Sequence, residues 1–217
     1  MTAPKLSPRL AAVKSFVRRD KIICDVGTDH ALLPCSLYLD GARKIIASDI
    51  NDGPLLSAKE TVRRYIGDET AITLVKSDGL DNIPFAEEII VAGMGGELIA
   101  RIVCECGFLS ADTHFILQPM TKAEILRTEL YANGFEITEE CAVKDSGRLY
   151  AVMSVNYSGV KKEISPAFSY TGLITDKEYL QRQADALFAA ANACKSSCSE
   201  KAERLFSVAQ QIKQKTI

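Results

Sequence analysis

Short apolar strand patterns alternate with helical patterns along the first 134 residues, and this alternation constrains the fold most strongly. The strand-like segments are residues 22–26, 44–49, 72–75, 88–92 and 114–117. The helical segments between and after them are residues 30–40, 53–66, 96–106 and 121–133. Strands with apolar cores that alternate with helices form a parallel sheet covered on both faces. The sequence therefore predicts an α/β fold.

The alternation stops after Gly134. Residues 136–143 and 149–157 are strand-like, and only five residues separate them. A connection that short predicts a hairpin, which adds an antiparallel edge to the parallel sheet. Five parallel strands followed by a hairpin are typical of the Rossmann-like sheet of a class I methyltransferase, whereas a dinucleotide-binding fold more often continues with βα units. We expect residues 1–158 to form this domain.

The last 40 residues show only helical periodicity, and we expect residues 159–217 to form a second domain. Apolar residues recur at steps of three and four in two runs: Leu180, Ala184, Leu187, Ala191 and Cys194, then Ala202, Leu205, Ala209 and Ile212. This spacing predicts a coiled-coil seam, with Cys194 and Cys198 as packing residues. Ser197 and Glu200 form a capping-box pattern that favours an antiparallel helical hairpin. One continuous helix with a stutter near Cys198 is the alternative.

Positive charge is concentrated at the two ends of the chain. Residues 1–21 hold six basic residues and one acidic residue, residues 158–217 hold nine and six, and residues 22–157 hold 11 and 21. A helix is predicted over residues 7–19, with Ser7 as its cap and with Arg9, Arg18 and Arg19 on its polar face. Basic ends on an acidic body fit an anionic partner, and a solvated helix face is the alternative.

Composition and cysteine spacing exclude several classes of protein. An apolar fraction of 47% with 25% charged residues excludes a mainly disordered chain. No 18-residue apolar window and no apolar N-terminal region occur, so we expect neither a membrane span nor a secretory signal. The seven cysteines form no CxxC pair, and the two histidines complete no zinc-ligand pattern. We therefore expect buried thiols in a reducing cytoplasm and no metal.

Acidic residues follow three successive strands, at the sheet edge where open α/β folds bind ligands. If the ligand is S-adenosylmethionine, Asp25 suits its ammonium group, Asp49 its ribose hydroxyls and Asp78 its adenine amino group. A turn or N-cap role is the alternative for each. The fingerprint G-x-G-x-x-G is absent after Gly27, and Asp29 would oppose a pyrophosphate, which disfavours an NAD-dependent oxidoreductase.

Other residues at this edge fit the same ligand. Gly27 lets the backbone approach a ligand, and the next helix offers free N–H groups to a carboxylate. Ile50 and Leu80 are placed to contact the faces of an adenine ring. His30 is either a general base or a partner of nearby backbone. His114 begins a strand, and we expect a structural role for it.

Six segments together resemble one protein family: Leu6–Leu10, Asp25–Pro34, Asp52–Leu55, Gly79–Leu80, Ala92–Ile99 and Ile116–Pro119. They are similar to segments of the bacterial tRNA (adenine-22-N1)-methyltransferases. The blocks Gly27–Ala31 and Ala92–Gly96 are specific to that family. The resemblance covers about residues 5–155 and is looser over residues 160–217, where the family also has a helical coiled-coil domain.

The resemblance implies a cytosolic enzyme that methylates N1 of an adenine in the D-arm region of tRNA with S-adenosylmethionine; we expect a monomer. The expected cofactor contacts are Asp25, Gly27, Thr28, His30, Asp49, Ile50, Asp78, Gly79, Leu80, Ala92, Gly93 and Met94. Many amino-methylating enzymes carry an Asn/Asp-Pro-Pro-aromatic motif where this chain has Ala92-Gly93-Met94. The amine-holding mechanism of that motif therefore does not transfer to this chain.

Adenine N1 is nucleophilic through its own lone pair, so the chemistry needs charge stabilisation more than proton removal. Asp29 is our candidate for the catalytic carboxylate that stabilises the forming cation, and an N-cap role is its alternative. Because N1 lies on the Watson–Crick edge, the adenine must be unpaired. We expect Arg9, Arg18, Arg19 and the hairpin to contact tRNA. A methyltransferase of another RNA, a protein or a small molecule, and a non-catalytic RNA-binding module, remain alternative functions.

Overall fold

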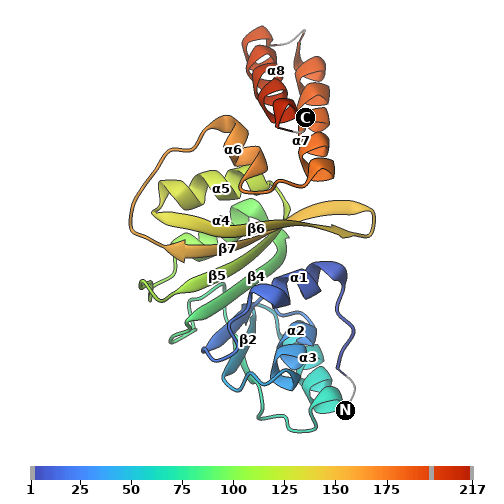
Figure 1. The fold of residues 1–217 in the computed structure, drawn as a ribbon. Helices are drawn as coiled ribbons and strands as arrows, with labels where there is room; N and C mark the ends of the chain where they lie inside the picture. Colours follow the sequence, from blue (N-terminus) through green and yellow to red (C-terminus); the bar gives the residue numbers. More distant parts are fainter. Residues whose placement is uncertain (1–2, 196–197, 216–217) are drawn as a thin grey trace.

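The computed structural model describes residues 3–195 and 198–215 and contains one seven-stranded sheet (Figure 1). The strand order is β3-β2-β1-β4-β5-β7-β6. The strands are β1 (Ile23–Val26), β2 (Ile45–Asp49), β3 (Thr73–Lys76), β4 (Glu88–Gly95), β5 (His114–Thr121), β6 (Phe135–Asp145) and β7 (Arg148–Tyr157). The first five run parallel, and the β6–β7 hairpin joins β5 antiparallel through β7. The predicted Rossmann-like methyltransferase sheet is confirmed.

The two faces of this sheet are covered by α1 (Pro8–Phe16), α2 (Leu32–Leu39), α3 (Asp52–Tyr65), α4 (Gly96–Cys104) and α5 (Ala123–Ala132). The last strand is followed by α6 (Pro166–Thr171), α7 (Lys177–Cys194) and α8 (Ser199–Gln214). One hydrophobic core lies under α1, α2 and α3, and the other lies under α4 and α5. Successive residues of the central strand alternate between the two, since Ile90 joins the first core while Ile89 and Val91 join the second.

The N-terminal helix is shorter than the sequence predicts. Ser7 caps it as expected, because its hydroxyl accepts a hydrogen bond from the Leu10 N–H. The backbone becomes extended at Val17, directly after the last helical residue, Phe16. Arg18 and Arg19 therefore lie beyond the helix and do not share a helix face with Arg9.

The C-terminal helices α7 and α8 fold back on each other (Figure 1). The extended backbone of Cys198 (φ −156°, ψ 93°) interrupts the helical path and excludes one continuous helix. The buried residues of the pair are Tyr179, Leu180, Ala184, Leu187, Ala191, Ala202, Val208, Ala209 and Ile212. Cys198 is exposed, so its predicted packing role is wrong; it precedes the first turn of α8 instead of facing α7. The predicted cap Ser197 lies outside the described residues.

A buried ion pair attaches this helical hairpin to the sheet. Arg127 on α5 donates hydrogen bonds to the carboxylate of Glu140 on β6, and both side chains are fully buried. Arg127 also donates to three oxygen atoms of the C-terminal segment: the carbonyls of Ser169 and Tyr170 and the hydroxyl of Tyr179. A buried charge is stable only when it is paired and hydrogen-bonded, as Arg127 is here. The domain division between residues 158 and 159 stays a prediction.

Gly172 lies against this ion pair. Its backbone has φ +54°, and a Cβ atom there would overlap the Glu140 carboxylate and the Arg127 guanidinium. The next residue, Leu173, donates its N–H to Glu140 Oε2 at 2.9 Å. The chain therefore passes from α6 toward α7 in direct contact with the buried carboxylate. The sequence did not predict α6, because six residues are too few to show a helical period.

Candidate active site

A cavity of about 260 Å³ opens at the carboxyl ends of β1 and β4. Its lining residues are Arg9, Leu10, Asp25, Gly27, Thr28, Asp29, His30, Leu32, Leu33, Ala92 and Gly93. The two blocks that carry the family resemblance therefore meet at one site. The cavity also includes Arg9, which the sequence assigned to RNA contact and not to the cofactor.

The turn between β1 and α2 forms one wall of the cavity. The N–H groups of Gly27 and Thr28 both donate to the Ser48 carbonyl, at 2.8 and 2.9 Å, which fixes the turn against β2. Gly27 has φ +72°, a conformation that glycine adopts without strain. A Cβ atom at Gly27 would overlap the terminal methyl group of Met94, so the two predicted blocks touch at this point. Glycine at this position therefore makes room for the Met94 side chain against the turn.

Asp25 supplies a buried carboxylate to the cavity. It is 6% exposed, and its Oδ2 accepts a hydrogen bond from the Thr28 hydroxyl at 2.7 Å. Burial raises the pKa of Asp25 to about 7, while the Thr28 hydrogen bond acts in the opposite direction. A cationic group beside this carboxylate would favour its ionised form. The site is therefore suited to an ammonium group.

Asp29 and His30 lie at the open side of the same cavity. Their side chains are 70% and 57% exposed, and His30 Nε2 lies 3.6 Å from Asp29 Oδ2. The N-cap of α2 is Ala31, and no side chain caps this helix. The alternative N-cap role for Asp29 is therefore wrong. Its left-handed backbone (φ +50°) places the carboxylate at the cavity instead.

Arg9 is held in the cavity wall by residues distant in sequence. Its Nη1 donates to Gln118 Oε1 at 2.6 Å, and its Nε lies 3.8 Å from Asp145 Oδ2. The guanidinium also lies over the Tyr150 ring, 5.9 Å from its centroid. The fully buried Gln118 accepts a second hydrogen bond, from the Gly93 N–H. These contacts fix the guanidinium beside Gly93, near the carboxyl end of β4.

Sequence reasoning missed three residues of this wall: Gln118, Asp145 and Tyr150. An uncharged polar residue inside the apolar strand β5 was the available signal for Gln118. Asp145 lay in a segment that predicted only a turn. Burial acts to raise its pKa, but hydrogen bonds from Ser146, Ser7 and the Arg9 backbone, with the charge of Arg9, hold the pKa of Asp145 below its ordinary value.

The remaining predicted cofactor residues lie outside the cavity. Asp49 ends β2, and its Oδ1 accepts the Asn51 N–H at 2.9 Å. Ile50 beside it is 52% exposed, so its side chain is accessible to a planar ring. These two residues keep the placement that the sequence predicted, at the carboxyl end of the second strand.

The segment after β3 is more enclosed. Asp78 forms an exposed ion pair with Arg101 at 2.9 Å. Leu80 is buried, and Gly79 packs against Ile102, which together tie this segment to α4. Leu80 therefore offers little surface to a ligand, whereas Asp78 remains exposed.

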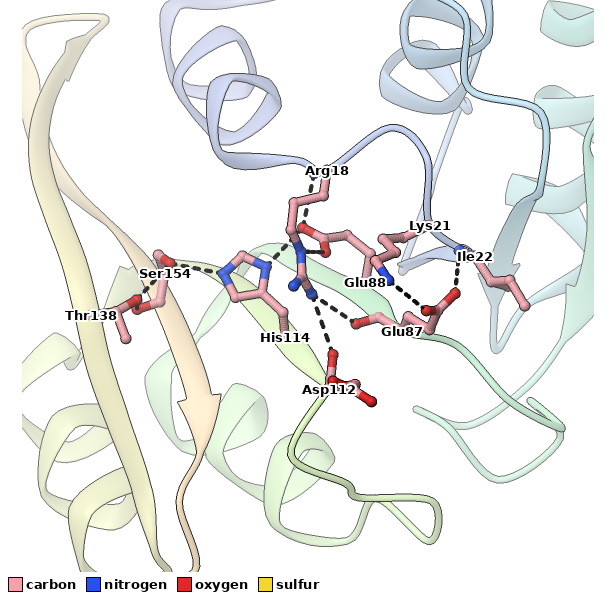
Figure 2. Close-up of polar contacts among 9 residues, drawn as sticks. All are labelled: Arg18, Lys21, Ile22, Glu87, Glu88, Asp112, His114, Thr138 and Ser154. Atoms are coloured by element: carbon pink, nitrogen blue, oxygen red, sulfur yellow. Dashed lines mark hydrogen bonds and ion pairs between the residues drawn. The ribbon is translucent and has the colours of Figure 1, made fainter.

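Arg18 lies at the opposite edge of the sheet, where β4 and β5 begin (Figure 2). Its Nε donates to Glu88 Oε2 at 2.6 Å, and its backbone N–H donates to Oε1. His114 Nδ1 lies 2.8 Å from the same Oε1, and His114 Nε2 lies 2.8 Å from the Ser154 hydroxyl. This network agrees with a structural role for His114. Arg19 is half exposed and pairs with Asp40 at 3.6 Å.

Neither a metal-binding cluster nor a membrane-spanning helix occurs in the described part of the chain. Among residues 3–195 and 198–215, no cluster of three His, Cys, Asp or Glu residues is arranged to hold a metal ion. Within that same part of the chain, no helix has the length and apolar character needed to cross a membrane.

Most of the chain, including the residues of the cavity, is similar to known methyltransferases. A methyltransferase-domain family model matches residues 6–153. The chain is 34% identical over 193 residues to the tRNA (adenine(22)-N(1))-methyltransferase of Bacillus subtilis (strain 168), covering 87% of this chain and 80% of the relative. The crystal structure of Streptococcus pneumoniae Sp1610 matches with a TM-score of 0.85 and 30% identity, over 98% of this chain and 100% of the other.

The same Streptococcus pneumoniae protein has been solved in complex with S-adenosyl-L-methionine. That structure matches with a TM-score of 0.78 and 29% identity, over 98% of this chain and 100% of the other. The likeness thus extends through the helical hairpin as well as the sheet. The chain belongs to the bacterial tRNA (adenine-22-N1)-methyltransferase family of methyltransferase-domain proteins.

Proposed function

We propose that this chain transfers a methyl group from S-adenosylmethionine to N1 of adenine 22 in tRNA. The observation that carries the proposal is the buried Asp25 carboxylate in a cavity formed by both blocks of the family resemblance. Gly27 also lines this cavity, in a turn fixed against β2. A buried anion beside this turn fits the cationic methionine end of the cofactor.

We assign the cofactor contacts by position along the sheet edge. Asp25 holds the ammonium group, and the first turn of α2 offers N–H groups to the carboxylate. Asp49 accepts from the ribose hydroxyls, beside the exposed Ile50. Asp78 accepts from the adenine amino group after its ion pair with Arg101 opens. Opening that pair costs little, because exposed ion pairs contribute only about 0–1 kcal/mol.

When bound, the cofactor supplies an electrophilic methyl group on a sulfonium. The lone pair of adenine N1 would form a bond to that methyl group as the sulfur–methyl bond breaks. The sulfonium would become a neutral thioether, and the positive charge would pass to the purine ring. Asp29 lies at the open side of the cavity, and its carboxylate stabilises this charge and accepts a hydrogen bond from the N6 amino group. Asp25 is unavailable for this role because it is buried behind the Thr28 hydroxyl. Asp29 is therefore the proposed catalytic residue.

The RNA is held by cations around the cavity and on the hairpin. Arg9 faces the cavity directly, and Arg19 is half exposed. Phosphate contacts of this kind position an RNA without reading its sequence. We expect a chain that lacks residues 160–217 to bind S-adenosylmethionine normally and tRNA weakly. A tRNA substrate also places the reaction in the cytoplasm.

The test is to incubate the protein with methyl-labelled S-adenosylmethionine and bulk tRNA, and then to map the modified base. The proposal expects label in tRNA as N1-methyladenine at position 22. Label at a different adenine would contradict the assigned position, and label in protein or small molecules alone would refute the proposed substrate.

The role of Asp29 needs a separate measurement. In single-turnover reactions, Asp29→Ala and the isosteric Asp29→Asn are expected to slow methyl transfer while leaving cofactor affinity near wild type. Both variants remove the negative charge, but only the first removes the side chain's volume. Unchanged chemistry with intact cofactor binding in both variants would refute the catalytic assignment.

A further inference from the structure

A second cavity, of about 190 Å³, lies where the sheet meets the base of the helical hairpin. The sheet contributes Pro119 and Lys122 from the end of β5 and the residue after it, and Tyr150 from β7. The C-terminal segment contributes Tyr170 from α6 and Gln183 from α7. The cavity is therefore complete only when both parts of the chain are present.

Arg9 separates this cavity from the first one. It lines the first cavity, and its guanidinium lies over the ring of Tyr150, which lines the second. Gln118, which holds Arg9, directly precedes Pro119 of the second cavity. A residue of the first cavity, Arg9, is therefore in contact with a residue of the second, Tyr150. An RNA that reaches both cavities would pass across Arg9.

The lining chemistry fits a nucleotide. Of the three tyrosines that line the cavity, Tyr150 and Tyr179 are buried and Tyr170 is half-buried, so Tyr170 offers the accessible ring. Gln183 adds an amide that donates and accepts hydrogen bonds. Unpaired RNA bases are recognised by aromatic stacking and by hydrogen bonds to their exposed edges. The volume is below the roughly 300–1,000 Å³ of pockets that enclose a whole small-molecule ligand. It suits a single planar group.

The charges around the cavity favour a base inside and a phosphate outside. Arg127 lines the cavity, but Glu140 neutralises it and its hydrogen bonds go to other protein atoms. Its charge is therefore not available to bind an anion. Lys122 is half exposed and forms an ion pair with Glu97 that a phosphate can replace.

We propose that this second cavity receives an unpaired nucleobase of the tRNA that flanks the target adenine. This inference rests on the proposed function, because it assigns a further contact to the same RNA substrate. Seating the neighbouring base beyond Arg9 keeps the target base out of its stack and in front of Asp29. The hairpin then positions the RNA with Tyr170 and Gln183, in addition to any phosphate contacts on its surface.

The test compares Tyr170→Ala with the conservative Tyr170→Phe in steady-state methylation of tRNA. Base–aromatic stacking predicts that Tyr170→Ala raises KM for tRNA by roughly 5- to 150-fold, and that Tyr170→Phe restores KM toward wild type. The affinity for S-adenosylmethionine and the salt dependence of tRNA binding are expected to stay constant, since no charge is lost. An unchanged KM for Tyr170→Ala overturns the inference.

A second readout remains informative if Tyr170→Ala folds poorly. Gln183→Ala removes only an edge contact on α7, and it is expected to raise KM for tRNA less than the loss of stacking does. A tRNA with 2-aminopurine on either side of the target should lose fluorescence on binding wild-type protein, because the base stacks. No change at either position overturns the inference. A wild-type protein that does not methylate tRNA refutes the proposed function instead.

Discussion

Arg9 Nη1 donates a hydrogen bond to Gln118 Oε1 at 2.6 Å, across 109 positions of sequence. Gln118 is fully buried in β5, and the same oxygen accepts the Gly93 N–H. Its Nε2 donates to the Pro119 carbonyl at 2.8 Å. One carboxamide therefore joins the N-terminal helix, Gly93 near the end of β4 and the end of β5 on one side of the cavity.

Replacing this carboxamide should destabilise the protein. In Gln118→Leu, the Gly93 N–H at the cavity loses its acceptor and Arg9 loses its anchor. Each lost hydrogen bond contributes about 0.5–1.5 kcal/mol, so we expect a loss of roughly 1–3 kcal/mol in the free energy of unfolding, measured in urea. The exposed Gln211→Leu on α8 is the control and should change stability by less than about 0.5 kcal/mol. Equal stability of the two variants would contradict the anchoring role.

Asp25 should make stability depend on pH. Burial raises its pKa to about 7, above the value of about 4 in an unfolded chain, so the folded state favours the protonated form. This contribution is complete below about pH 4 and is lost as pH rises through 7. Relative to Asp25→Asn, the ligand-free wild type should lose stability between about pH 4 and 7, by on the order of 4 kcal/mol at most. A difference between the two proteins that stays constant over this range would contradict the assignment.

The affinity for S-adenosylmethionine should also depend on the ionisation of Asp25, but it should increase with pH whereas the stability of the ligand-free protein decreases. The ionised carboxylate binds the ammonium group, so affinity for S-adenosylmethionine should increase from pH 6 to pH 8 in the wild type. Asp25→Asn should bind more weakly and without this pH dependence. Calorimetric titration at several pH values measures both effects. If the affinity of Asp25→Asn changed with pH as much as that of the wild type, a group other than Asp25 would be responsible for the pH dependence.

Arg18→Met should affect stability and not RNA binding. The substitution leaves the fully buried Glu88 without its guanidinium partner, and breaking such a pair costs about 3–5 kcal/mol, with less expected here because Arg18 is partly exposed. A phosphate contact removed from a single strand would lower the slope of log affinity against log salt by about 0.7. We expect the salt slope of tRNA binding to stay at the wild-type value. A lower slope would show that Arg18 contacts a phosphate of the tRNA.

Arg127 and Glu140 should behave as a strongly coupled pair. Either Arg127→Met or Glu140→Leu alone leaves an uncompensated charge in the interior and should cost about 3–5 kcal/mol of unfolding free energy. The double variant Arg127→Met/Glu140→Leu should lose less than the sum of the single variants. A double-mutant cycle in urea measures the coupling, and additive losses would contradict it.

The sequence was sufficient to predict the site residues that lie at the carboxyl ends of parallel strands. Asp25, Gly27, Ala92 and Gly93 each follow or end a parallel strand, and such strands bring their carboxyl ends to one edge. Periodicity and chain order were enough to place them. The N-cap alternative for Asp29 failed for a local reason as well, since the helix begins two residues later than its position required.

The parts that were missed depend on contacts between distant segments. Nothing near Arg9 in the sequence indicates that its partner is Gln118, because β5 and α1 meet only in the folded chain. Arg18 resembled a surface cation until the fold placed Glu88 beside it. Cys198 matched the helical spacing, but its extended backbone removed it from the seam.

Gly172 limits how this architecture can vary among related chains. Any side chain at that position would collide with the carboxylate that Arg127 neutralises. Exposed positions of α7 and α8 are free of this restriction, so the outer surface of the hairpin can diversify to suit different RNAs. The residues that attach the hairpin to the sheet cannot vary in the same way, because they pack against the buried Arg127–Glu140 pair. Sequence divergence should therefore be high along the arms of the hairpin and very low at its base.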